Sequence, residues 1–90
     1  MKTCVATTKA DCFDLKYFKT CTKVEDNGTE GSFYGVSVEK YTDDLLIEEM
    51  DSGPLSDSNT LITDIINQLA QGSVTPFALC QVLDEIDVLY

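Results

Sequence analysis

The sequence predicts an α+β protein in which an antiparallel meander of about four strands precedes a two-helix hairpin packed on one sheet face, in the order ββββαα. Two observations lead to this fold class. The first half of the chain has the composition of strands, with β-branched residues at 3–8 and, over residues 34–39, the period-two alternation that is typical of a half-buried strand. After Gly53 and Pro54, apolar residues recur at the spacing of an amphipathic helix. A chain of 90 residues has room for one modest core, so we expect a single domain over residues 1–90.

The first two predicted strands are residues 3–8 and 13–25, joined by a turn at residues 9–12. The first strand is short and rich in β-branched residues, which favour extended backbone. The Asn27-Gly28 pair after the second strand is the clearest hairpin signal, because both residues tolerate the positive φ of a type I′ turn. The polar and glycine residues at 29–31 indicate a loop longer than two residues.

The third and fourth predicted strands are residues 32–41 and 45–50, with a polar turn between them. Apolar residues alternate with small or charged residues along the third strand. We expect Gly53-Pro54 to end the region of the fourth strand, since proline cannot donate to a sheet ladder. Short turns between consecutive strands favour an antiparallel meander.

Two helices are predicted, at residues 57–71 and 76–88. Ser and Asp residues before the first helix are good N-caps, and Gly72 stands where a left-handed C′ glycine belongs. Thr75 as N-cap and Pro76 as first residue favour the start of the second helix. The predicted apolar stripes consist of Leu61, Ile62, Ile65, Ile66, Leu69 and Ala70 in the first helix and of Phe77, Leu79, Cys80, Val82, Leu83 and Ile86 in the second.

A two-layer fold leaves one sheet face without a cover, and aromatic residues on that face would form a surface for a partner or a second copy. Acids crowd the C-terminal end of the second helix, where they oppose the helix dipole and indicate a partner cation or packing on the sheet. The candidate interaction residues are Tyr17, Phe18, Phe33, Tyr41, Asp84, Glu85 and Asp87. Exposed edge strands offer a second route to association, by strand addition.

The charge is distributed unevenly along the chain. Six Lys and six acids balance within residues 1–40, whereas residues 41–90 carry ten acids and no base, which accounts for the net charge of −10. Such a field repels nucleic-acid phosphates and anionic membranes and attracts basic proteins, polyamines or divalent cations. We therefore expect a protein partner, no nucleic acid and no membrane, and no apolar run has the length of a membrane span.

The absent residue types narrow the chemistry. The chain has no His, the usual proton shuttle near neutral pH, and no Arg, the usual clamp for phosphate. The acids of residues 43–51 do not follow the EF-hand pattern, and the corner between the helices has no basic residue for a DNA-reading role. We expect no enzymatic activity, no catalytic or metal-ligating residue and no cofactor.

The four cysteines, Cys4, Cys12, Cys21 and Cys80, contain no CxxC pair that would indicate a zinc site. The N-terminus lacks the apolar run of a signal peptide, so we expect a cytoplasmic protein whose thiols are reduced. We predict free thiols that are buried or half-buried, with Cys80 on the apolar side of its helix.

Two short motifs carry a resemblance. Tyr34-Gly35-Val36 is an aromatic-Gly-aliphatic strand, and Val74-Thr75-Pro76 is a corner between two helices. In these motifs the last two-thirds of the chain resembles a family of small uncharacterised proteins of unknown function from Gram-positive anaerobic bacteria. The resemblance implies the strands-then-helices architecture and a bacterial cytosol. Family members often carry His and several basic residues after the corner, where this chain has Ala78 and Leu79, so no site residue is transferred.

The function itself is not specified by the sequence. These observations favour a small non-enzymatic cytosolic protein-interaction or regulatory module, with a second copy of the chain, forming a homodimer, as one such partner. One alternative is a small-ligand or divalent-metal-binding module built from the acids or cysteines. Another is an acidic inhibitor or nucleic-acid mimic that occupies a basic cleft of its partner.

Overall fold

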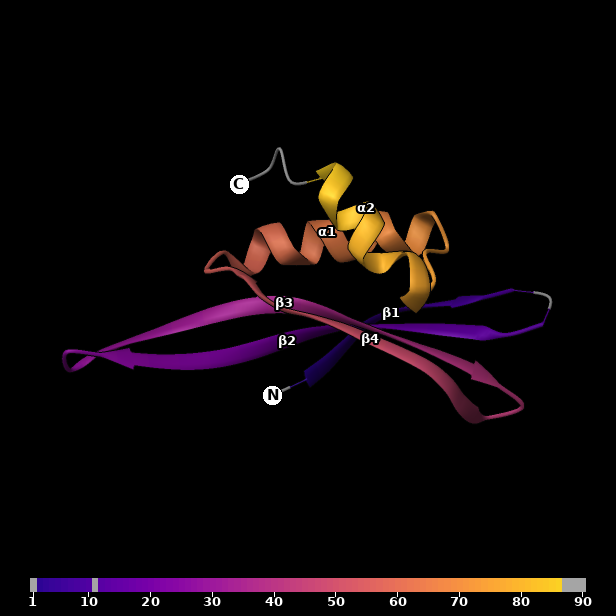
Figure 1. The fold of residues 1–90 in the computed structure, drawn as a ribbon, viewed down its shortest axis with the longest axis horizontal. Coiled ribbons are helices and arrows are strands. Elements are labelled where there is room, and N and C mark those ends of the chain that lie inside the picture. Colours follow the sequence, from indigo (N-terminus) through magenta and orange to yellow (C-terminus); the bar gives the residue numbers. More distant parts are fainter. Residues whose placement is uncertain (1, 11, 87–90) are drawn as a thin grey trace.

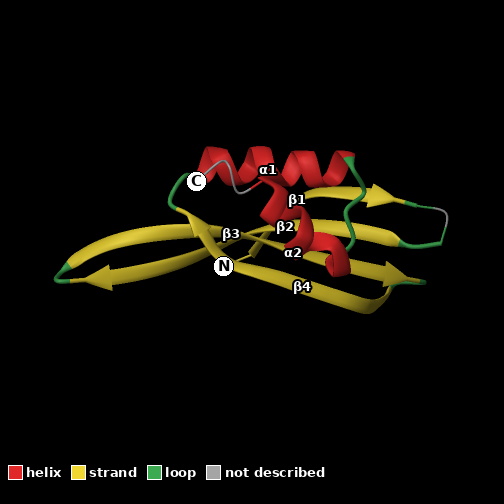
Figure 2. Cartoon of the chain, turned by 45° about the horizontal axis from the view of Figure 1, so that its top comes forward, coloured by secondary structure: helices red, strands yellow, loops and turns green. Residues whose placement is uncertain are grey.

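The computed structural model describes residues 2–10 and 12–86. Four antiparallel strands form one sheet in the order β1-β2-β3-β4, and two helices joined by a short 3-10 turn follow them. Both helices lie on the same side of the sheet (Figures 1 and 2), which confirms the predicted ββββαα fold. The elements are β1 (Lys2–Lys9), β2 (Asp14–Asp26), β3 (Thr29–Thr42), β4 (Leu45–Ser56), α1 (Asn59–Gln71), η1 (Pro76–Ala78) and α2 (Leu79–Ile86).

The core lies between the helices and the sheet face that they cover. Its members are buried apolar residues of β2, β3, α1 and α2, namely Leu15, Tyr17, Val36, Val38, Ile62, Ile65, Ile66, Leu69, Leu79 and Leu83. Burial of such a side chain stabilises the fold by about 1.5–3 kcal/mol. Burial also raises the pKa of Tyr17 to about 12, and its hydroxyl donates a 2.8 Å hydrogen bond to the carbonyl oxygen of Val74. This bond ties the corner after α1 to the centre of the sheet.

Two tight turns set the register of the hairpins. Asn27 and Gly28 adopt φ of 52° and 79°, and Asp26 pairs directly with Thr29. The hairpin therefore has the minimal two-residue loop, and the longer loop indicated by the sequence is wrong. Left-handed residues at both positions match the twist of the flanking strands, so no further residue is needed. Asp43 and Asp44 make the second such turn, between β3 and β4, with φ of 52° and 65°.

The fourth strand does not end before Gly53-Pro54, as the sequence predicts, but continues through that pair to Ser56. β4 is an edge strand, so a proline whose missing N–H faces outward removes no ladder bond. Gly53 adopts φ of 73° within a stretch where the pairing with β3 shifts register. The Ser52 Oγ accepts a 2.9 Å hydrogen bond from the Val36 N–H and so replaces part of the ladder there.

The bulged part of β4 crosses directly over Gly35. A Cβ added to Gly35 would lie 2.1 Å from the carbonyl oxygen of Gly53 and 2.9 Å from the Thr20 Oγ1. No side chain fits this space, because real Cβ atoms do not approach a carbonyl oxygen so closely. The glycine of the Tyr34-Gly35-Val36 motif is thus required by the approach of β4.

The helix ends agree with the sequence signals in part. The Ser58 Oγ accepts a 3.2 Å hydrogen bond from the Leu61 N–H and caps α1, as expected from the Ser and Asp residues there. At the other end Gly72 has φ of −89°, and the left-handed residue is Ser73, with φ of 50°. Pro76 begins a 3-10 turn, and α2 begins only at Leu79. The last two residues of the predicted second helix, 87 and 88, lie outside the described residues.

The cysteines are more exposed than predicted. All four lie in the described residues and form no disulfide; Cys4, Cys12 and Cys80 are exposed, and Cys21 is half-buried. The placement of Cys80 in the core is wrong, because α2 turns Leu79 and Leu83, four residues apart, toward the sheet. In the described part of the chain, neither helix has the length and apolar character needed to cross a bilayer.

The crossing over Gly35 leads to a stability prediction. Gly35→Ala should lower the free energy of unfolding by about 2–3 kcal/mol, since β4 must move to admit the new methyl group. Urea unfolding would measure this loss. Gly72→Ala is the matched control: the nearest atom to its Cβ is 3.7 Å away, so its stability should stay level or rise by up to about 1 kcal/mol. Equal destabilisation by both changes would contradict the crossing.

Candidate interaction surfaces

The sheet face away from the helices carries the side chains that alternate with the core residues. Along β3, Val36 and Val38 face the helices, so Ser37, Glu39 and Tyr41 face away from them. Unexpectedly for an uncovered face, Ser37 is buried and Glu39 is only 7% exposed. Neighbouring side chains on the same face must therefore cover them.

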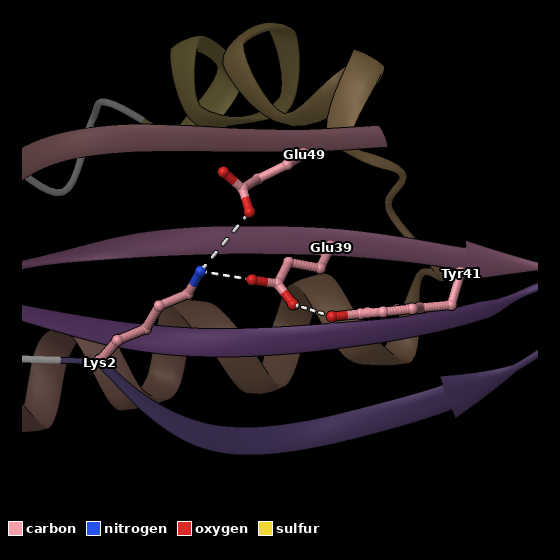
Figure 3. Close-up of polar contacts among 4 residues, drawn as sticks. All are labelled: Lys2, Glu39, Tyr41 and Glu49. Atoms are coloured by element: carbon pink, nitrogen blue, oxygen red, sulfur yellow. Dashed lines mark hydrogen bonds and ion pairs between the residues drawn. The ribbon is translucent and has the colours of Figure 1, made fainter. Parts of the chain in front are cut away.

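A network of charged and phenolic side chains provides this cover (Figure 3). Lys2 of β1 makes an ion pair with Glu39 of β3 and lies 3.8 Å from a carboxylate oxygen of Glu49 of β4. The Tyr41 hydroxyl donates a hydrogen bond to the other oxygen of Glu39. The Lys2 ammonium also lies 4.7 Å from the centre of the Phe18 ring. Because β2 lies between β1 and β3, Lys2 links the first edge of the sheet to its third and fourth strands.

The network shifts the pKa values of its members. Burial by itself would raise the pKa of Glu39, but the hydrogen bonds from Lys2 and Tyr41 outweigh it, so the pKa of Glu39 is lowered. The hydrogen bond to Glu39 raises the pKa of Lys2 and also that of Tyr41. Glu39 is thus held ionised, Lys2 charged and Tyr41 protonated, which is an arrangement that fixes the strands and gives no group a pKa suited to proton transfer near pH 7.

The aromatic residues predicted for an interaction surface fall into different environments. Tyr17 does not lie on an accessible surface, because its strand position faces the helices and it is fully buried. Phe18 and Tyr41 lie on the uncovered face but are half-buried, each with a lysine ammonium 4.7 Å from its ring centre. Phe33 is exposed, on the same face and nearer the β2–β3 turn. That these three residues bind a partner stays a prediction.

The acidic residues predicted for the same role cannot be placed in a surface. Asp84 and Glu85 belong to α2, but their side chains are outside what the structure describes. Asp87 lies outside the described residues altogether. The predicted surface at the end of the second helix therefore lies outside the described side chains.

A hollow of about 350 Å³ lies at the end of the sheet, beside the β3–β4 turn. Three carboxylates line it, those of Asp14, Asp43 and Asp44, together with Tyr41 and Phe13. Over residues 2–10 and 12–86, no group of three or more acids and cysteines is arranged to hold a metal ion. The three carboxylates give the hollow a negative charge that attracts cations.

The other unusual surface lies along β4 and the 3-10 turn beside it. Large apolar side chains are exposed there: Phe77 is 87% exposed, Leu45 68%, Ile47 54% and Leu46 48%. The Glu48 carboxylate accepts a 2.8 Å hydrogen bond from the Phe77 N–H, which holds the 3-10 turn against the strand. We refer to Leu45, Leu46, Ile47 and Phe77 as the β4 edge surface.

Sequence reasoning did not identify this surface. It assigned Phe77 to the apolar stripe of the second helix, but the residue lies in the 3-10 turn, whose spacing turns it outward. It treated Leu45, Leu46 and Ile47 as part of an ordinary strand. The signal that could have been used is the run of three consecutive apolar residues, since a strand with one covered face buries only alternate positions.

The comparison with family models gives one match, to a family of unknown function (DUF6514), over residues 1–87. The chain belongs to this family. The match reaches well beyond the last two-thirds of the chain on which the two short motifs lie. No curated protein and no solved structure matches the chain.

Residues of the two short motifs have structural roles in this fold. Gly35 admits the β4 crossing, the Val74 carbonyl accepts the hydrogen bond from Tyr17, and Pro76 is buried at the start of the 3-10 turn. Packing and backbone geometry explain the presence of these three residues.

The network on the uncovered face leads to a prediction about pH. The pKa of Glu39 is lower in the folded chain than in the unfolded chain, so its carboxylate stabilises the fold above the unfolded pKa of about 4.3. That contribution is lost as the pH falls through the folded pKa. Glu39→Gln should cost about 1–2 kcal/mol at pH 7, and the difference from wild type should shrink toward pH 3.

Urea unfolding of both proteins from pH 3 to 7 would measure this difference. Glu49 and Asp51 also lie near Lys2, so the comparison between variants isolates Glu39. Glu49→Gln is the matched control, since that carboxylate is 3.8 Å from Lys2 and about half exposed; it should cost less than about 0.5 kcal/mol. A Glu39→Gln difference that stays constant with pH would contradict the role given to the carboxylate.

Proposed function

We propose that the protein is a non-enzymatic protein-interaction module whose partner docks on the β4 edge surface. The observation that carries this proposal is the exposure of Leu45, Leu46 and Ile47 on β4 together with that of Phe77, whose N–H is bonded to Glu48 of the same strand. Isolated exposed apolar residues are ordinary, but a group of large ones along a sheet edge is typical of an interaction site. A phenylalanine anchor and three aliphatic neighbours resemble the centre of a protein interface.

Binding at the β4 edge surface is favourable because its exposed apolar area costs free energy while it is in contact with water. Burial of apolar surface contributes about 25 cal/mol per Å², and an aromatic side chain alone can bury about 150–250 Å². The fold itself gains almost nothing from Phe77, because the side chain is nearly as exposed as in an unfolded chain. A partner that covers it would gain that free energy, which supports a role in binding.

The uncovered face is a weaker docking site than the β4 edge surface. At its centre the charge of Lys2 is matched by that of Glu39, and lysines lie over the rings of Phe18 and Tyr41. A partner there would have to displace existing interactions. At the β4 edge surface the side chains are exposed, so binding would displace only water.

The charge and the cysteines support the rest of the proposal. Ten acids and no base in residues 41–90 favour a basic protein over nucleic acid or an anionic membrane as the partner. Exposed thiols at Cys4, Cys12 and Cys80 fit a reducing compartment, which supports a cytoplasmic location.

Replacing the exposed apolar residues should separate binding from stability. Leu45→Thr, Ile47→Thr and Phe77→Ser, combined in one variant, should change the free energy of unfolding by less than about 1 kcal/mol, since the residues are exposed. The variant should lose at least tenfold in affinity for a partner captured from the native host and then purified. Titration calorimetry would measure the affinity, and urea unfolding the stability.

The matched control is Phe33→Ser, which removes an exposed aromatic residue from the uncovered face, the surface that the sequence prediction assigned to a partner in competition with this proposal. It should bind the purified partner with wild-type affinity. If the combined variant bound as tightly as wild type, or if Phe33→Ser alone lost the partner, the β4 edge surface would not be the docking site.

A further inference from the structure

We propose that the partner binds by adding an extended segment to the free edge of β4 as a fifth strand, and that this segment alternates basic with apolar residues. The inference rests on the proposed function, because it names the chemistry of the partner at the same surface. It adds the mode of binding, through backbone hydrogen bonds, and the charge of the bound segment.

The first support is the position and openness of β4. It is the last strand in the sheet order, so one row of its backbone N–H and C=O groups has no strand beside it. Consecutive residues are exposed along it, at 45–47 and again at 49–51. Exposure of neighbouring residues, which point to opposite faces of a strand, means that neither face of this stretch is well covered. Extended backbone with a free edge is the template that strand addition requires.

The second support is the regular geometry of one stretch. Pairing between β3 and β4 runs without a shift from Glu48 to Asp51, and the register shifts lie on either side of it. Regular extended residues present their outward backbone groups at a constant spacing, whereas bulges disturb it. The regular stretch can pair with about four residues of a peptide, or roughly 13 Å, and Leu45, Leu46 and Ile47 lie at and beyond the register shift at its end. Phe77 lies beside it and supplies an aromatic contact for an apolar residue of the peptide.

The third support is charge complementarity. Glu48, Glu49 and Asp51 lie on the strand itself, and Asp43 and Asp44 form the turn before it. Lys2 offsets part of the charge of Glu49 from 3.8 Å away, and no basic residue occurs anywhere in residues 41–90. Opposite charges across a strand pair stabilise it and like charges destabilise it. Basic side chains in the added strand are therefore favoured over acidic ones.

The same charges argue against a second copy of the chain as the occupant. If two copies of β4 paired antiparallel about the centre of their regular stretch, Glu48 of one copy would lie opposite Asp51 of the other, and these like charges would repel. Pairing of β4 with the lysine-bearing β1 of another copy would instead be head-to-tail, and such contacts extend into filaments unless they close into a ring. A separate basic segment avoids both problems.

A synthetic probe tests the proposal with the full-length protein. The probe is a nine-residue peptide, capped at both ends, in which lysine and valine alternate; one control peptide has glutamate in place of lysine, and a second has every backbone nitrogen methylated. Hydrogen exchange read by mass spectrometry should show slowed exchange within residues 45–51 with the lysine–valine peptide and not with either control. Its affinity, from fluorescence anisotropy, should fall at least fivefold between 50 and 200 mM salt.

Variants locate the effect on the strand. Glu49→Gln should weaken the lysine–valine peptide at least twofold, whereas Asp64→Asn, which removes the same charge from the exposed side of α1, should leave its affinity unchanged. Equal binding of the methylated peptide would overturn strand addition, because attraction by charge alone needs no backbone N–H. Slowed hydrogen exchange in β1 instead of β4 would overturn the assignment of the peptide to the β4 edge of the sheet.

The remaining outcomes separate this inference from the proposed function. Sedimentation showing a dimer whose β4 amides are already protected without peptide would replace the basic segment by a second copy. If the combined Leu45, Ile47 and Phe77 variant lost its natural partner while the probe left β4 exchange unchanged, strand addition would fail and the docking surface would stand. If neither experiment showed an effect at β4, both proposals would fail.

Discussion

In the described residues the apolar core lies on one face of the sheet, where the apolar stripe of α1 packs on Leu15, Tyr17, Val36 and Val38. The hydrogen bond from Tyr17 to the Val74 carbonyl fixes the chain at the corner after α1. That corner determines where the 3-10 turn and α2 can lie, and Figure 2 shows them crossing above the sheet near β4. Within the described residues, the helices cover the centre of one face and leave the other face and the outer edge of β4 to be stabilised in other ways.

The uncovered face is stabilised by polar and aromatic side chains in place of a third layer. Glu39 can be almost buried there because Lys2 and Tyr41 satisfy its two oxygens, which is the condition for burying a carboxylate at acceptable cost. The ion pair also fixes β1, since Lys2 reaches across β2 to strands from which β1 is separated. Electrostatic interactions thus stabilise the strands on this face, whereas apolar packing stabilises them on the other.

The edge of β4 has no comparable cover, and its composition is unusual for a free edge. Natural edge strands are protected from other chains by charges, bulges and prolines. β4 has all three devices, in Glu48 to Asp51, in its register shifts and in Pro54, yet it also exposes three consecutive apolar residues. Specificity needs repulsion of the wrong partner as well as attraction of the right one. The acids of β4 repel a second copy and leave apolar area exposed, and selective recognition of a basic segment requires this combination.

The sequence by itself determined the features that depend on neighbouring residues. The order of strands and helices, the Asn27-Gly28 turn, the cap at Ser58 and the apolar stripe of α1 all follow from local backbone preference or from a short period of apolar residues. The uneven charge is likewise a property of composition. These features were enough to predict the fold class, and they included no part of the β4 edge surface.

Only the tertiary structure decided the features that depend on residues far apart in the chain. Gly53-Pro54 breaks a central strand but not an edge strand, so the length of β4 depended on its place in the sheet. The aromatic residues that face outward are those on the sheet face that the helices do not cover. Tyr17 lies on the covered face and is therefore in the core. The pairing of Lys2 with Glu39, 37 residues apart, and the outward position of Phe77 have no local signal. Each follows from contacts formed only when the sheet and helices are assembled, which local preference cannot report.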